Sequence, residues 1–135
     1  MKEFNWPIRV YYEDTDSAGV VYHSNYLRFM ERARTEWLRE LGYSHNELCE
    51  AENLVFVVSS MNIDFKRPAY FDELLNVRSC VTKLSGSSLV FEQIVINKAE
   101  EIKCRADVYI ACVDPITFKP KRIPAAIRAE FNHDI

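Results

Sequence analysis

Residues 11 to 26, YYEDTDSAGVVYHSNY, concentrate groups that could do acid–base or nucleophilic chemistry. Glu13, Asp14 and Asp16 lie within four residues, and His23 follows after a glycine bend. A carboxylate can take a proton from water or attack an activated carbonyl group, and an imidazole can donate or accept a proton. On these residues alone, however, the favoured interpretation of Asp16 is a turn aspartate that binds local backbone N–H groups.

The segment lies between two periodic patterns. Residues 8–13 are rich in β-branched and aromatic side chains and predict a strand that ends in this turn. From Ser24, a candidate N-cap, apolar residues recur at three- and four-residue steps and predict an amphipathic helix of about five turns that ends at Gly42. A shorter helix follows from Ser44, with Glu47 completing a capping-box pattern. Asp16 is therefore expected on a loop before a long helix, where functional side chains are common.

Beyond residue 54 the apolar period becomes two, which is typical of strands. One face of the first strand is expected to hold Val57, Ser59, Met61, Ile63 and Phe65. Three more strands are predicted at 74–84, 88–97 and 102–113, and short turns between them make them antiparallel neighbours. In the last strand, Lys103 is expected on the polar face.

These elements predict an α+β domain in which one curved antiparallel sheet of about five strands wraps a long central helix. We expect one strand, the helix and then a four-strand meander, with residues 1–135 forming a single domain. With 48% hydrophobic and 27% charged residues, the composition is that of a globular protein. Long strands leave edges that usually pair, so a homo-oligomer is expected.

Charge and residue spacing argue against several classes of function. The net charge of −3 favours neither nucleic acid nor an anionic membrane as a partner. No stretch resembles a signal peptide or a transmembrane helix, so a cytoplasmic protein is expected. The histidines and cysteines have no metal-ligand spacing, and the cysteines are expected to be reduced and in or near the core. These residues are His23, His45, His133, Cys49, Cys80, Cys104 and Cys112.

Four stretches together resemble one known family: EDTDSAGVVYHSNY, FVVSSMNIDFKRPA, SGSSLVFEQ and CVDPITFKPKRIP. They resemble the 4-hydroxybenzoyl-CoA thioesterase family of the hot-dog fold and, within it, the bacterial acyl-CoA thioesterases encoded beside the Tol-Pal envelope genes. The resemblance implies a long helix wrapped by an antiparallel sheet. It also implies a homodimer or homotetramer that binds acyl-CoA between subunits and hydrolyses the thioester to a free acid and coenzyme A, without a metal or an organic cofactor.

The resemblance also implies roles for individual residues. Asp16 matches the catalytic aspartate, as nucleophile or general base, because it is the acid followed two residues later by Ala-Gly. His23 matches the position whose backbone amide binds the oxyanion, at a helix start where N–H groups lack intrahelical partners; its side chain either adds a hydrogen bond or only caps the helix. Tyr12 would orient the carboxylate, or else is a core aromatic of the strand. Asn25 is a candidate substrate contact or a first-turn capping residue, and Glu13 and Asp14 are interpreted as solvated or structural.

Binding of the coenzyme A phosphates is less clearly encoded. Relatives specific for 4-hydroxybenzoyl-CoA carry a basic cluster in the hairpin after the second long strand, where this chain has only Lys83. Lys66, Arg67, and further along Lys119 or Lys121, are the alternative phosphate ligands. The loss of that cluster favours an aliphatic, short-chain acyl group over an aromatic one, delivered on coenzyme A or on acyl carrier protein.

Two other functions remain open. A dehydratase of the same fold would use a histidine–acid pair, for which His23 and Glu31 are the available residues. A non-catalytic partner of the Tol-Pal envelope system would need no such pair, because a fold does not determine a function.

Overall fold

The computed structural model describes residues 2–132 and contains one sheet and three α-helices. In chain order the elements are β1 (Glu3–Arg9), a 3-10 turn (Tyr12–Asp14), α1 (Asn25–Glu40), α2 (His45–Glu52), β2 (Val55–Phe65), β3 (Leu74–Leu84), β4 (Ser88–Ile96), β5 (Ile102–Val113) and α3 (Ala125–Phe131). His133, one of the scattered histidines, lies outside the described residues. None of the helices within residues 2–132 is both long enough and apolar enough to cross a bilayer.

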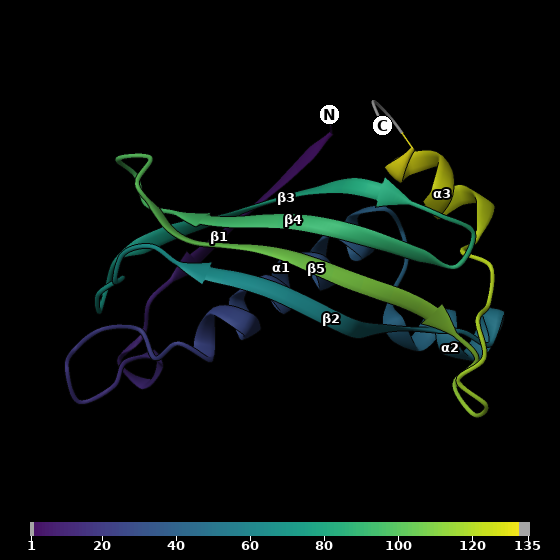
Figure 1. Ribbon diagram of the computed structural model, residues 1–135, viewed down its shortest axis with the longest axis horizontal. Coiled ribbons are helices and arrows are strands. Elements are labelled where there is room, and N and C mark those ends of the chain that lie inside the picture. The colour runs from purple at the N-terminus through teal and green to yellow at the C-terminus, as the bar shows by residue number, and fades with distance from the viewer. Residues whose placement is uncertain (1, 133–135) are drawn as a thin grey trace.

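The five strands are antiparallel and follow the order β1-β3-β4-β5-β2 (Figure 1). The expected pairing of β3 with β4 and of β4 with β5 is confirmed. The expectation of a four-strand meander is wrong, because β2 pairs with β5 at the far edge and β1 lies beside β3. A period of two identifies a strand and its faces, but it carries no information about which strand becomes its neighbour.

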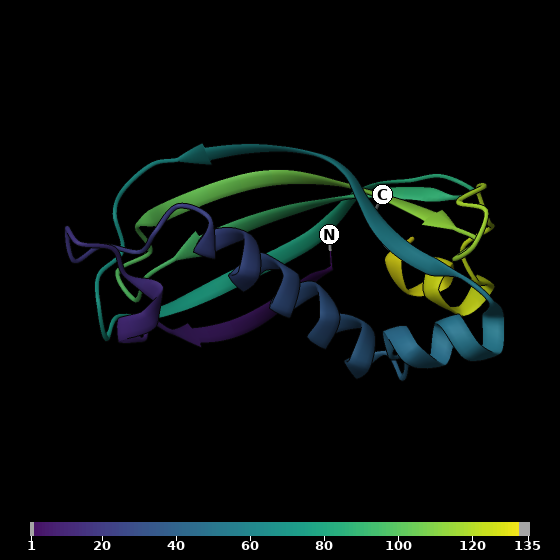
Figure 2. The same ribbon diagram turned by 90° about the horizontal axis from the view of Figure 1, so that it is seen from below.

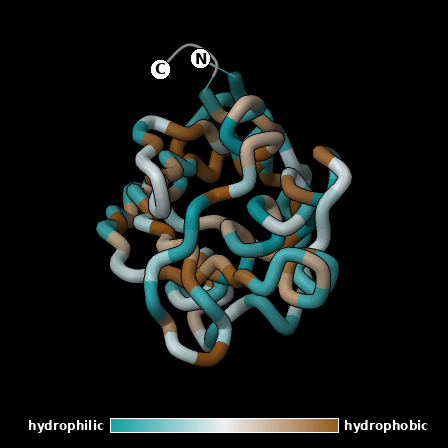
Figure 3. Tube along the Cα trace, turned by 90° about the vertical axis from the view of Figure 1, so that its right-hand side faces the viewer, coloured by the Kyte–Doolittle hydropathy of each residue, from teal (hydrophilic) through white to brown (hydrophobic). Residues whose placement is uncertain are grey.

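Helix α1 lies against the inner side of the curved sheet, as Figure 2 shows. Its apolar stripe puts Phe29, Met30 and Ala33 at 0% exposure, so the expected central helix is confirmed. The helix ends before Gly42, whose φ of 95° belongs to the left-handed region that glycine tolerates. The end-on view in Figure 3 shows hydrophobic and hydrophilic segments alternating along the trace, as expected for elements with one buried face.

Two local expectations at the N-terminal side need correction. The strand predicted over 8–13 is displaced: β1 spans Glu3–Arg9, and the chain turns in a 3-10 helix at Tyr12–Asp14. Ser24 does occupy the N-cap position of α1, but its side chain makes no capping hydrogen bond. Ser44 in contrast caps α2 as expected, with its oxygen accepting from the Glu47 amide at 3.1 Å.

Irregularities in strand pairing displace two more residues from their predicted faces. A shift in the β2–β5 register between Val58 and Ser60 puts Val57 on the face opposite Met61 and Ile63. A second shift, where Val95 pairs with Cys104 but Ile96 pairs with Ile102, accompanies the burial of Lys103 at 5% exposure. Lys103 was expected on a polar face, so this is a correction.

Candidate active site

The segment around Asp16 is a small hairpin closed by a bridge between Thr15 and Val21. The Asp16 amide donates to the Val20 carbonyl at 2.9 Å, and the Gly19 amide donates to the Asp16 carbonyl at 3.0 Å. Gly19 has a φ of 79°, a conformation that disfavours residues with a Cβ atom. The local sequence therefore builds a tight turn that holds Asp16 at a defined place.

The Asp16 carboxylate is exposed and has two differently used oxygens. Oδ1 accepts a hydrogen bond from the Ala18 amide at 2.9 Å, as the turn interpretation predicts. Oδ2 has no hydrogen-bond or ion-pair partner among residues 2–132. The turn role and a chemical role are therefore compatible, because one oxygen orients the group while the other stays available.

Asp14, two residues earlier, is a structural residue. It is 6% exposed; its Oδ2 accepts from the Tyr11 amide at 2.8 Å, and its Oδ1 accepts from Asn25 Nδ2 at 2.9 Å. Its carbonyl also accepts from the Tyr22 amide at 2.9 Å. The side chain of Asn25, the first residue of α1, thus ties the start of the helix to Asp14 and, within residues 2–132, makes no capping hydrogen bond there.

His23 lies two residues before α1, at the positive end of the helix dipole. Its ring is exposed and lies against Tyr22 and Phe65, with centroid distances of 4.4 Å and 6.1 Å. Within the described chain the His23 amide makes no hydrogen bond. A free N–H group beside a helix N-terminus is suited to binding a negatively charged oxygen.

A hollow beside His23 brings several candidate residues together. It is lined by Val21, His23, Tyr26, Phe65, Lys66, Arg67 and Pro68. Two predicted substrate ligands, Lys66 and Arg67, are therefore close to His23. Tyr26 is 3% exposed and its hydroxyl accepts from the Ala69 amide at 3.3 Å, while burial raises its pKa to about 12. Tyr26 therefore stays neutral and supports the hollow.

The structure does not bring Tyr12 or Lys83 to this hollow within one chain. Tyr12 is 79% exposed and packs edge-on against Phe71, with a centroid distance of 5.8 Å. The core interpretation of Tyr12 is therefore wrong. Its hydroxyl makes no hydrogen bond within residues 2–132, so its role in orienting the Asp16 carboxylate stays a prediction. Lys83 lies near the C-terminal end of β3, and Leu74 begins that strand. At about 3.3 Å per residue the two residues are roughly 30 Å apart.

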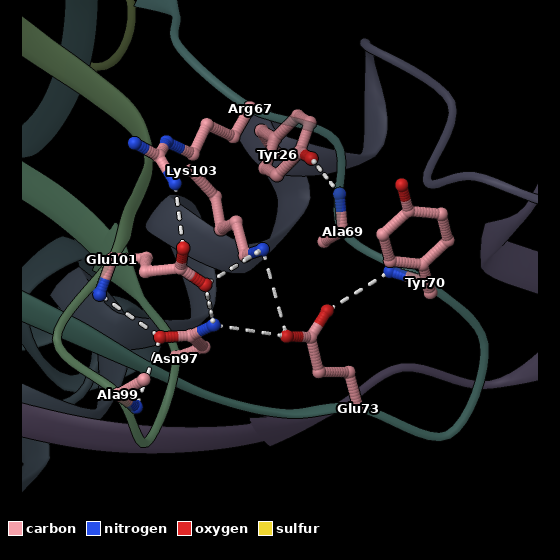
Figure 4. Close-up of polar contacts among 9 residues, drawn as sticks. All are labelled: Tyr26, Arg67, Ala69, Tyr70, Glu73, Asn97, Ala99, Glu101 and Lys103. Atoms are coloured by element: carbon pink, nitrogen blue, oxygen red, sulfur yellow. Dashed lines mark hydrogen bonds and ion pairs between the residues drawn. The ribbon is translucent and has the colours of Figure 1, made fainter.

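A polar network that joins Glu73 to Asn97, Glu101 and Lys103 was missed by the sequence analysis (Figure 4). Lys103 Nζ lies 3.6 Å from Glu73 Oε2 and 4.0 Å from Glu101 Oε1. Asn97 Nδ2 donates to the same two oxygens, at 3.3 Å and 2.8 Å. Hydrogen bonds from Asn97 and the charge of Arg67 lower the pKa of Glu101. The only signal of this network in the sequence was the turn at Asn97 with its polar side chains.

A second, mostly apolar cavity of about 230 Å³ lies between α1, β2 and α3. Its apolar lining includes Phe56, Val58, Leu89, Phe91, Ile110 and Phe131. Glu31, Arg34, Thr35 and His45 contribute polar groups. Glu31 therefore lies on a different cavity from His23, so one chain does not form the His23–Glu31 pair that a dehydratase would need. No three His, Cys, Asp or Glu side chains in the described range are grouped to hold a metal ion.

Comparisons with known proteins identify relatives that cover almost the whole chain. The chain is 46% identical over 129 residues to the acyl-CoA thioester hydrolase YbgC of Escherichia coli O6:H1, covering 96% of each chain. It is 44% identical over 130 residues to the acyl-CoA thioesterase YbgC of Haemophilus influenzae, covering 96% of this chain and 95% of the relative. The crystal structure of a probable thioesterase from Bartonella henselae superposes with a TM-score of 0.86 at 39% identity, covering 91% and 100% of the two chains.

The fold has a wider distribution than these relatives. A 1,4-dihydroxy-2-naphthoyl-CoA thioesterase from Synechocystis superposes with a TM-score of 0.91 at 22% identity, covering 98% and 97% of the chains, which establishes the hot-dog fold. The family model described as thioesterase superfamily matches residues 18–104, which include the bend after Asp16, His23, α1 and the network around Lys103. With that match and relatives at this level of identity, the chain belongs to the thioesterase superfamily.

Proposed function

We propose that the protein hydrolyses acyl-CoA thioesters, with Asp16 as the reacting carboxylate and the His23 amide as the oxyanion donor. One observation carries this proposal. Within residues 2–132, the hairpin holds Asp16 with one carboxylate oxygen free, and His23, just after the hairpin, has a free backbone amide at the start of α1. The names of the relatives from Escherichia coli and Haemophilus influenzae support acyl-CoA as the substrate class.

The chemistry asks for two groups. As a general base, Asp16 takes a proton from water while the oxygen attacks the thioester carbonyl carbon. As a nucleophile, Asp16 attacks that carbon itself and forms a mixed anhydride that water then hydrolyses. On either route the carbonyl oxygen gains negative charge, the His23 N–H stabilises it, and the C–S bond breaks to release a thiolate that takes up a proton.

The substrate is expected to be held at two regions. Lys66 and Arg67 carry positive charge at the hollow and suit the phosphates of coenzyme A, whereas Lys83 could contribute only from another subunit. A short aliphatic acyl group fits a mostly apolar cavity such as the one lined by Phe56 and Val58. Acyl carrier protein remains an alternative donor, because it presents the same type of thioester.

A homo-oligomer would bring these regions together. β2 is an edge strand, with Phe65 beside His23 at one end and Phe56 and Val58 on the cavity at the other. If β2 pairs antiparallel with β2 of a second copy, the Phe65 end of one chain meets the Val55 end of the other. Asp16 and His23 of one subunit would then face the apolar cavity of its partner, and each site would draw on both chains.

The test is a panel of saturated acyl-CoAs of increasing chain length, with released coenzyme A detected by a thiol reagent. Release by the wild-type protein, and its loss in Asp16→Asn, is the expected result. A protein-only trace is subtracted, because the chain itself carries free thiols, of which Cys49 is half-buried. Conversion of hydroxyacyl or enoyl thioesters without release would instead identify a dehydratase, and inactivity towards the whole panel would favour a non-catalytic partner.

Solvent label found in the protein would identify a nucleophilic route for Asp16. In single-turnover reactions in H₂¹⁸O, a general-base mechanism puts the label directly into the released acid. A nucleophilic route whose anhydride is hydrolysed at the aspartyl carbon would instead leave label in the protein after the first turnover. Mass spectrometry of the peptide that contains Asp16 measures this difference.

A further inference from the structure

The segment 66–73 forms a platform for the candidate site. Its Ala69 is fully buried, accepts a hydrogen bond from the Val21 amide at 2.8 Å and donates one to Tyr26. Tyr70 forms a bridge with Val20. Val20 in turn accepts the hydrogen bond from the Asp16 amide, so the platform determines where the hairpin that holds Asp16 lies.

Lys103 contacts this platform through both its backbone carbonyl and its side chain (Figure 4). Its carbonyl accepts hydrogen bonds from the Lys66 and Arg67 amides, at 2.9 Å and 3.2 Å. Its ammonium group lies between Glu73 and Glu101 and 6.0 Å from the centre of the Tyr70 ring. The side chain therefore contacts both the end of the platform and the turn between β4 and β5.

The charges of Glu73 and Glu101 explain how the Lys103 ammonium group can be buried. A buried ammonium group is costly unless carboxylates compensate it, and a carboxylate pair without a cation between them repels. Glu73 also accepts a hydrogen bond from the Tyr70 amide at 3.0 Å, so its attraction to Lys103 helps to fix the backbone of the platform. Glu101 is held separately by Asn97 and Arg67.

We propose that Lys103 is a positioning residue for thioester hydrolysis: through Glu73 it seats the 66–73 platform, and through Ala69 it sets the placement of the Asp16 hairpin and the His23 amide. Lys103 does not contact the reacting atoms in this arrangement. The inference rests on the proposed function, because its kinetic consequence concerns that reaction. Its structural consequence can be measured without any substrate.

The first test variant is Lys103→Met, which keeps the aliphatic stem and removes the charge. Glu73→Gln is the milder second variant, since glutamine still offers Oε1 to the Tyr70 amide but loses most of the attraction to Lys103. The matched control is Arg105→Met on the same strand. Arg105 is also a cation between two carboxylates, Glu92 and Asp107, but it makes no contact with the platform.

Two measurements are made on each variant that keeps the wild-type circular dichroism and mass. Amide hydrogen exchange at Val21 should become about tenfold faster or more in both test variants and stay unchanged in the control. The kcat should fall about tenfold to a hundredfold, since small misplacements of catalytic groups have effects of this size. It should fall with an acyl-pantetheine as well as with acyl-CoA, because Asp16 and the His23 amide are displaced. Lys66 and Arg67 also lie on the platform, so the KM for acyl-CoA should rise in addition.

Several results would overturn the inference. Wild-type exchange at Val21 together with wild-type kcat in a folded Lys103→Met, or in Glu73→Gln if the first variant does not fold, removes it. Faster exchange with unchanged kcat also removes it, because the platform would then move without affecting the reaction. A defect confined to the KM for acyl-CoA would assign Lys103 to phosphate binding instead. If the wild-type protein hydrolyses no thioester, the proposed function fails, while exchange at Val21 still decides whether Lys103 holds the platform.

Discussion

Exchanging Asp14 and Asp16 separately for asparagine should split stability from catalysis at two positions only two residues apart. Asparagine keeps the size of aspartate and one acceptor oxygen but cannot act as a base or a carboxylate nucleophile. The two side chains have opposite surroundings, since Asp16 is exposed whereas Asp14 is 6% exposed. The same chemical change therefore has different expected costs.

For Asp16→Asn, the hydrogen bond at risk among residues 2–132 is that from the Ala18 amide to the side chain, and the amide oxygen of asparagine can still accept it. The free energy of unfolding should change by less than about 1 kcal/mol. Turnover of acyl-CoA should nevertheless fall about a hundredfold or more, the usual loss for a missing general base, and further for a nucleophile.

For Asp14→Asn, two donors, Tyr11 N and Asn25 Nδ2, face a group that now has one acceptor oxygen and one NH₂ group. One donor loses its acceptor in a buried place, so unfolding should become easier by about 1–3 kcal/mol. Residual folded protein should keep most of its kcat, because Asp14 has no oxygen left for chemistry.

Urea unfolding and the coenzyme A release assay measure both quantities on the same preparations. Glu13→Gln, an exposed neighbour in the same segment, serves as the control and should change neither. Near wild-type turnover in Asp16→Asn would show that another carboxylate reacts, and loss of turnover in a stable Glu31→Gln would move the site onto α1. Equal stability losses in the two asparagine variants would contradict the assignment of Asp14 as the structural member.

Four further outcomes are expected. His23→Ala should keep part of the turnover because the backbone amide remains, whereas His23→Pro, which lacks that N–H, should lose far more; equal losses in folded variants would argue against a backbone oxyanion donor. Burial raises the pKa of Tyr26 from 10.0 to about 12, so the folded state keeps a proton that the unfolded state releases. The contribution of Tyr26 to the free energy of unfolding should therefore be constant below pH 10 and fall by roughly 3 kcal/mol towards pH 12, and chemical denaturation of Tyr26→Phe should lack this loss. Burial also raises the pKa of the thiols of Cys80, Cys104 and Cys112, that of Cys104 to about 12. Timed thiol titration near pH 8 should therefore modify the half-buried Cys49 first, and simultaneous reaction of all four cysteines would refute this. Val58→Lys, which puts a charge at the β2 edge, should give a monomer by light scattering with little turnover, and full activity as a monomer would refute the shared site.

The local elements could be predicted from the sequence because their signals are local. The three- and four-residue spacing of apolar side chains located α1, and the alternation in residues 74–113 located β3, β4 and β5 nearly to their ends. Glycine at position 19 and the acids before it indicated the turn that presents Asp16. These features depend on backbone preferences and side-chain spacing within a few residues of each other.

Only the tertiary structure decided which of these elements become neighbours and which polar side chains are buried. β2 passes to the far edge of the sheet, so Phe65, Lys66 and Arg67 arrive beside His23, while Lys83 is carried to the opposite end. Lys103 was expected on a polar face, yet it is buried because Glu73, on a distant segment, supplies a compensating charge. The physical reason is that periodicity sets the faces of an element, whereas pairing register, bulges and long-range charge compensation depend on residues far away in the chain.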